Sequence, residues 1–174
     1  MQQLISLLVE NKPGALMRVA GVLTSRGYNI ESLTVAKALD PTLSIMTIVA
    51  EVGETGRDLL IKQISRLVNV IKAVDLTQSR AVRREMVLIR VYVEGARRAA
   101  LLTEAQIFRA HVVDASQTSY MIEATGSPDK LDALISLLRS YGPIEVVRSG
   151  AMAMARSKHN KLPVPYFSET TQAG

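Results

Sequence analysis

The sequence contains no cysteine and no tryptophan, and it has no long apolar run. Without cysteine, the chain cannot form a disulfide, bind a metal through thiolates or use a cysteine nucleophile. No apolar segment approaches the length that crosses a bilayer, and the first six residues lack the charged start and apolar stretch of a signal peptide. We therefore expect a soluble, cytoplasmic protein without a membrane partner.

Aromatic side chains are also scarce, at 4% of the chain, although the net charge is +5 and the pI is near 9.7. The densest basic group consists of Arg80, Arg83, Arg84, Arg90, Arg97 and Arg98. A protein that binds single-stranded nucleic acid needs aromatic rings among such cations for base stacking, and only Tyr92 lies nearby. We expect no nucleic-acid partner; the basic face meets an acidic protein or solvent.

Residues that could support catalysis are few and scattered. The two histidines, His111 and His159, do not have the spacing of a metal-binding pair. The sequence has no phosphate-binding Walker loop and no dinucleotide fingerprint, and no nucleophile motif surrounds Ser44 or Ser119. We expect a non-catalytic protein with no metal site.

The first half of the chain alternates apolar runs with one-sided helical stripes. The pattern predicts strands at 4–9, 30–37, 43–51 and 70–76. It predicts one helix at 15–26, with Leu16, Val19, Ala20 and Leu23 on its buried face. A second helix is expected to bury Leu60, Ile61, Ile64, Leu67 and Val68. This is the βαββαβ order of a ferredoxin-like fold.

The second half repeats this order. Strands are predicted at 87–93, 112–115, 120–125 and 144–147. A helix at 96–110 is expected to bury Ala100, Leu101, Ile107 and Phe108, and a second helix begins with Ser127 as its N-cap and ends before Gly142. The fold class is therefore α+β, with two tandem ferredoxin-like domains at 1–78 and 86–156. A basic linker at 79–85 joins them, and a flexible tail follows at 157–174.

The stretch 10–35 is the most informative part of the sequence. Pro13 suits the first position of a helix, and Gly14 lets a ligand or another chain approach the backbone closely. The N–H groups of Gly14, Ala15 and Leu16 then lie at the positive end of the helix dipole, where an anion is favoured. Gly27 is a typical helix stop. The same residues also fit an ordinary strand–turn–helix in which Asn11 and Pro13 only cap the helix.

The motifs in this stretch resemble those of a known family, and this resemblance favours the anion site over an ordinary strand–turn–helix. Asn-Lys-Pro-Gly-Ala-Leu at 11–16 and Arg-Gly-Tyr-Asn-Ile-Glu-Ser-Leu at 26–33 resemble the ACT domain of the regulatory (small) subunit of acetohydroxyacid synthase, also called acetolactate synthase. Asp-Pro-Thr-Leu-Ser at 40–44 continues the match. The resemblance covers about residues 1–156 and makes the two expected domains an ACT domain and an ACT-like domain.

The resemblance implies a regulatory subunit without catalytic activity of its own. Such a subunit binds the catalytic large subunit, raises its activity and confers feedback inhibition by valine. Thiamine diphosphate, magnesium and FAD are then carried by the large subunit, and this chain binds no cofactor.

The resemblance also implies where valine binds. ACT domains of this family pair side by side, so the chain is expected to form a homodimer or larger assembly with sites at the interface. One protomer would contribute Asn11, Pro13, Gly14, Ala15 and Leu16, and the other Asn29 and Ile30. Backbone amides would hold the carboxylate of valine, and the asparagine side chains its ammonium.

Two other classes of function remain open at this stage. The chain could be an amino-acid-sensing regulator of transcription or of another biosynthetic enzyme, which would need a DNA-binding element or a different partner. It could also be a small ferredoxin-like hydrolase of the acylphosphatase kind, which would turn over substrate alone.

Overall fold

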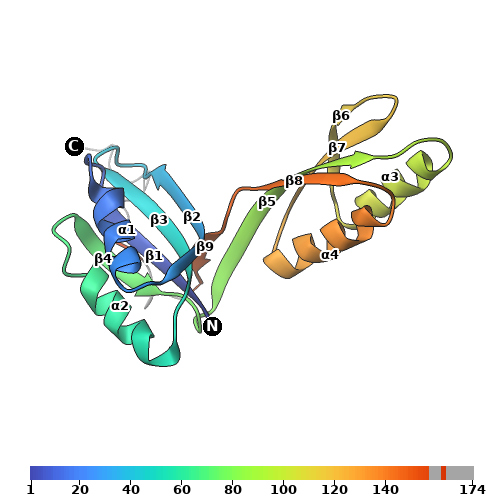
Figure 1. The fold of residues 1–174 in the computed structure, drawn as a ribbon. Coiled ribbons are helices and arrows are strands. Elements are labelled where there is room, and N and C mark those ends of the chain that lie inside the picture. Colours follow the sequence, from blue (N-terminus) through green and yellow to red (C-terminus); the bar gives the residue numbers. More distant parts are fainter. Residues whose placement is uncertain (157–161, 164–174) are drawn as a thin grey trace, which may run out of the picture. The chain divides into compact units, whose positions relative to one another are not determined.

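The computed structural model describes residues 1–156 and 162–163, and within this part the chain divides into two compact units. Unit 1 comprises residues 1–82 together with the described residues from Ala153 onward, and unit 2 comprises residues 83–152. The expected tail at 157–174 falls outside the described residues except for Leu162 and Pro163. Each unit combines an antiparallel sheet with two α-helices, which confirms the α+β fold class (Figure 1).

Unit 1 has the strand order β2-β3-β1-β4. Its elements are β1 (Gln2–Glu10), α1 (Ala15–Ser25), β2 (Asn29–Lys37), β3 (Leu43–Glu51), a 3-10 turn η1 (Glu54–Gly56), α2 (Arg57–Ile64) and β4 (Val70–Asp75). The sheet follows from the alternation of apolar side chains: Ile5, Leu7 and Val9 of β1 face the same core as α1 and α2. The helix α2 ends at Ile64, so Val68 lies beyond it and is exposed, contrary to the expected helical stripe.

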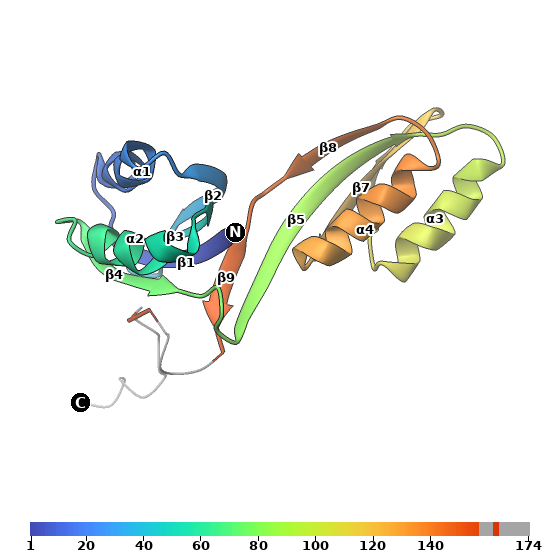
Figure 2. The same cartoon turned by 60° about the horizontal axis from the view of Figure 1, so that its bottom comes forward.

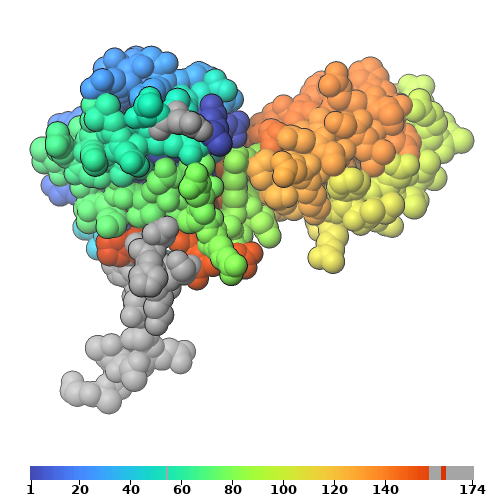
Figure 3. All heavy atoms as spheres, turned by 90° about the horizontal axis from the view of Figure 1, so that it is seen from below, coloured from blue at the N-terminus to red at the C-terminus, as the bar shows by residue number. Residues whose placement is uncertain are grey.

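Unit 2 has the corresponding order β6-β7-β5-β8. Its elements are β5 (Ala81–Tyr92), α3 (Arg97–Ile107), β6 (His111–Ala115), β7 (Ser119–Gly126), α4 (Pro128–Arg139) and β8 (Ile144–Arg148). Helices α3 and α4 lie side by side on one face of the sheet (Figure 2), and their side chains cover that face in the space-filling view, yellow for α3 and orange for α4 (Figure 3). Leu101 is buried as expected, but Ile107 is 75% exposed because it lies on the outer face of α3.

One boundary and one strand differ from the sequence expectation. Strand β5 begins at Ala81, so most of the segment 79–85 is strand rather than linker. Its partner there is β9 (Met152–Ala155), a short strand that pairs with β5 and was not expected. Four residues carry too weak a pattern to identify a strand, and the strand with which they pair lies some 70 positions earlier in the chain.

The helices α1 and α3 end in the same way. After α1, the N–H of Gly27 donates to Thr24 and the N–H of Tyr28 donates to Leu23, which is a Schellman motif with Gly27 at φ 69°. Gly27 is thus the helix stop, as expected. After α3, the N–H of Arg109 donates to Gln106 and that of Ala110 donates to Ala105. Here Arg109 occupies the left-handed position, at φ 55°, which costs about 1–2 kcal/mol relative to glycine.

Candidate functional site

The turn between β1 and α1 is built around Gly14. Gly14 is the N-cap of α1 and has φ 82°, in the left-handed region that only glycine adopts freely. A Cβ added to Gly14 would meet nothing within 4 Å, so the backbone faces open space. The sequence predicts Pro13 as the first helical residue, and this prediction is wrong. The left-handed glycine interrupts the helical run, and α1 begins at Ala15.

The amide donors of the turn differ by one residue from those expected. The N–H of Ala15 donates to the carbonyl of Lys12 at 3.2 Å, and the first helical bond joins the N–H of Arg18 to Gly14 at 3.0 Å. Within the described residues, the N–H groups of Gly14, Leu16 and Met17 have no acceptor. These three donors lie at the positive end of the α1 dipole, and the first turn contains no acidic residue to occupy it. The turn can therefore accept a carboxylate.

The side chains of the first helical turn divide between core and surface. Ala15, Val19 and Leu23 form the buried face of α1. Leu16, expected on that face, is 37% exposed, and Met17 is 72% exposed. Leu16 thus presents an apolar side chain beside the amide donors, and Ala15 does not contribute its side chain to the turn's surface.

Hydrogen bonds to the following loop fix the shape of the turn. Asn11 donates its backbone N–H to Thr42 at 2.7 Å and its side-chain Nδ2 to Pro41 at 2.9 Å. In the described residues nothing donates to the Oδ1 of Asn11, which leaves it as an acceptor. Thr42 in turn donates both its N–H and its hydroxyl to Asp40, and these bonds lower the pKa of Asp40. The Asp-Pro-Thr segment therefore braces the turn from the side.

The strand end before the turn is also fixed. Lys12 forms a 3.1 Å ion pair with Glu10, and Asn69 donates to the other carboxylate oxygen of Glu10 at 2.7 Å. These two hydrogen bonds, that from Lys12 first, hold the pKa of Glu10 below its usual value. Arg18 of α1 donates to Oδ1 of the same Asn69. These contacts tie the end of β1 and the first turn of α1 to Asn69.

Asn29 and Ile30 lie at the other end of the sheet. Asn29 pairs with Glu51 at the end of β3, whereas Glu10 pairs with Leu43 at its start. A nine-residue strand spans about 27 Å between its ends. Asn29 is exposed and donates to Glu31 at 2.6 Å, and Ile30 is half-buried against the core. Within one chain the structure does not bring these two residues to the Gly14 turn.

Strand β2 is an edge of its sheet. Among the described strands it pairs only with β3, and a bulge interrupts that pairing between Ile30 and Ser32. Val35 on this edge is 41% exposed. An exposed edge strand is a ready surface for pairing with another chain, so β2 offers a route by which a second copy could add its own β2.

Other kinds of site are not found in the described part of the chain. No group of three or more histidine, aspartate or glutamate side chains there could hold a metal ion. No described helix is long and apolar enough to cross a membrane. His111 lies at the start of β6 in unit 2, and His159 lies outside the described residues.

Known proteins resemble the chain over both units. A family model described as the small subunit of acetolactate synthase matches residues 84–157, and one described as an AHAS small subunit-like ACT domain matches residues 5–72. The probable acetolactate synthase small subunit of Archaeoglobus fulgidus is 46% identical over 156 residues, covering 90% of this chain and 98% of its own. The acetolactate synthase small subunit of Haemophilus influenzae is 42% identical over 163 residues, and the match covers 93% of this chain and 100% of that protein.

A solved structure extends the likeness to three dimensions. The crystal structure of the acetolactate synthase small subunit from Thermotoga maritima has a TM-score of 0.80 and 34% identity, and the match covers 90% of this chain and 98% of that one. The two family models, at 5–72 and 84–157, take in the Gly14 turn, the edge strand β2 and nearly all of unit 2.

Proposed function

The chain belongs to the family of acetolactate synthase small subunits, and on this basis we propose that it activates a catalytic large subunit and makes it sensitive to feedback inhibition by valine. The observation that carries this proposal is the likeness to small subunits across both units. On the same family basis, thiamine diphosphate, magnesium and FAD would be bound by the large subunit.

We assign valine binding to the Gly14 turn of unit 1. The N–H groups of Gly14, Leu16 and Met17 would hold the carboxylate, with the dipole of α1 adding to the attraction. Oδ1 of Asn11 would accept a hydrogen bond from the ammonium. Leu16 would contact the isopropyl group, whose full burial contributes about 1.5–3 kcal/mol.

The second half of the site would come from another copy of the chain. If two β2 strands pair antiparallel around a two-fold axis, the start of one β2 lies beside the end of the other. The end of β2 lies at the same end of the sheet as the turn. Lys37 of β2 pairs with Ser44 of β3, and the neighbouring Leu43 of β3 pairs with Glu10, just before the turn. Asn29 and Ile30 of one copy would then approach the turn of its partner, which one chain alone cannot achieve.

Reconstitution tests the proposed function. We expect the isolated protein to form no acetolactate from pyruvate, because it lacks groups that activate a nucleophile. Added to its cognate large subunit, it should raise the synthase rate, and valine should reverse that increase. The measurement is acetolactate formation with each subunit alone and with both. Turnover by this chain alone, after contamination is excluded, would contradict the proposal.

A second experiment tests the proposed dimer. We expect the protein to sediment as a dimer or larger assembly, and Val35→Asp on β2 to shift it toward monomer because pairing would carry an unpaired carboxylate of each copy into the interface. Ile71→Asp is the matched control, since Ile71 is 49% exposed on β4, the opposite edge of the sheet. Equal behaviour of the two variants in sedimentation equilibrium would argue against pairing through β2.

A further inference from the structure

Unit 2 contains a cavity between the end of α3 and the start of β6. Its volume is about 660 Å³, which lies in the range of small-molecule sites. Four apolar and three polar residues line it, and the three polar ones are exposed. The residues that matter here are Leu102, Ala105, Val112, Gln106, Arg109 and His111.

Arg109 is the unusual member of this set. Arg109 occupies the left-handed position after α3, as Gly27 does after α1. The two helix ends make equivalent hydrogen bonds, so the strained backbone of Arg109 does not improve the end of α3. Residues kept in such conformations concentrate at binding and active sites, where the side chain matters more than the strain. The feature that arginine supplies at this position, and glycine would not, is the guanidinium.

The charge around Arg109 is unbalanced. Arg83, Arg90 and Arg148 of the same unit each form an ion pair with a carboxylate, whereas Arg84, Arg97, Arg98 and Arg139 form none within the described residues. Within the described residues no carboxylate lies within ion-pair distance of Arg109, and none lines the cavity. A guanidinium binds a carboxylate through two parallel hydrogen bonds, and the amide of Gln106 is a further donor among the lining residues. Glu123 pairs with His111 in the sheet but does not line the cavity, so an ammonium group would find no anionic partner in its wall.

We propose that this cavity is a second ligand site, which binds a small carboxylate with a short branched or linear apolar chain and no ammonium group. Arg109 would hold the carboxylate, and Leu102, Ala105 and Val112 would contact the apolar chain. The site differs in chemistry from the Gly14 turn, whose Asn11 offers an acceptor for an ammonium. It lies entirely within unit 2 and does not depend on the proposed valine site.

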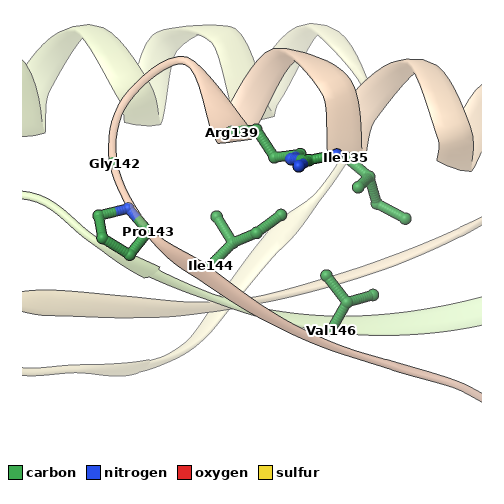
Figure 4. Close-up of a pocket in the computed structure, with 6 residues that line it drawn as sticks. All are labelled: Ile135, Arg139, Gly142, Pro143, Ile144 and Val146. Carbon is green, nitrogen blue, oxygen red and sulfur yellow. The ribbon is translucent and has the colours of Figure 1, made fainter.

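A similar hollow in the same unit provides an internal control. It has a volume of about 630 Å³ and lies between the end of α4 and β8, lined by Ile135, Ile144 and Val146 (Figure 4). Arg139 is the one polar residue that lines it, with no second donor of the kind that Gln106 supplies. Arg139 is also part of regular helix rather than held in a left-handed conformation.

The test is an NMR titration of the full chain with 3-methylbutanoate, followed at the amides of Ala110 to Val112. 3-Methylbutylamine, which has the same carbon skeleton and the opposite charge, is the second probe. We expect the carboxylate to bind and the amine not to bind. Arg109→Gly should lower the affinity for the carboxylate about tenfold or more, the usual loss for a hydrogen bond to a charged group. Arg139→Gln should leave that affinity unchanged.

Arg109→Gly also separates loss of binding from loss of folding. Because glycine relieves the left-handed strain, this variant should melt at the same temperature as the parent protein or higher. Equal binding of the amine, unchanged binding by Arg109→Gly, or shifts confined to Gly14–Met17 would each overturn the proposal. Gly14→Asp should retain the unit 2 signal, so that failure of the valine site and failure of this one can be told apart.

Discussion

Gly14→Asp is expected to abolish valine inhibition of the reconstituted synthase while the large subunit remains activated. The new carboxylate would lie among the N–H groups of Gly14, Leu16 and Met17 and satisfy them in place of the ligand. A like charge about 4 Å away costs a bound carboxylate about 1 kcal/mol in water and about 4 kcal/mol near a protein surface. Affinity should therefore fall by about a hundredfold or more. Calorimetric titration with valine and an inhibition curve of the reconstituted enzyme measure the effect.

The backbone of Gly14 makes a control necessary. Its φ of 82° strains any side chain by about 1–2 kcal/mol, so the good tolerance of aspartate in an ordinary first helical turn does not apply here. Gly14→Asn has nearly the same shape, tolerates the left-handed region better than most residues and carries no charge. We expect Gly14→Asn to weaken valine binding less than Gly14→Asp does, although the two variants should have similar stability. If Gly14→Asp binds valine as the parent protein does, the turn is only a helix start.

Gly142→Ala is expected to destabilise unit 2 strongly. A Cβ on Gly142 would lie 2.1 Å from the carbonyl oxygen of Tyr92, which is backbone and cannot rotate away. The chain at this point is held by the hydrogen bond from the N–H of Tyr92 to Pro143 at 3.0 Å. Overpacking typically costs about 1–3 kcal/mol, and a contact with rigid backbone is expected at the upper end of that range, which corresponds to a fall of roughly 12–24 °C in the melting temperature of a domain of this size.

Gly126→Ala is the matched control for that variant. The nearest atom to a Cβ at Gly126 is Cδ of Lys130, the flexible part of a half-buried side chain, so the lysine can move aside. Hydrogen exchange at the buried amides of Ile89 and Ile122 reports on unit 2 separately from unit 1. Equal protection in the two variants would mean that the loop at Gly142 relaxes without loss of stability.

Local sequence pattern determined much of the fold. Strand β3 runs from Leu43 to Glu51 as expected, and α1 ends where Gly27 predicted. The fold class also followed from the sequence, because the period of apolar residues, 2 in strands and 3.6 in helices, is a property of neighbouring positions. The motif around Gly14 identified the family for the same reason, since its residues are adjacent in the chain.

Tertiary structure decided what depends on distant residues. Nothing in the sequence near Pro13 indicates that Gly14 is left-handed, so the free amides are those of Gly14, Leu16 and Met17 and not of Ala15. Strand β9 forms because β5 lies beside it, and Gly142 is essential only because Tyr92 passes within contact distance. The separation of Asn29 from the turn is likewise set by strand pairing. Backbone conformation in a turn and approach between segments depend on packing across the sheet, which the order of neighbouring residues does not encode.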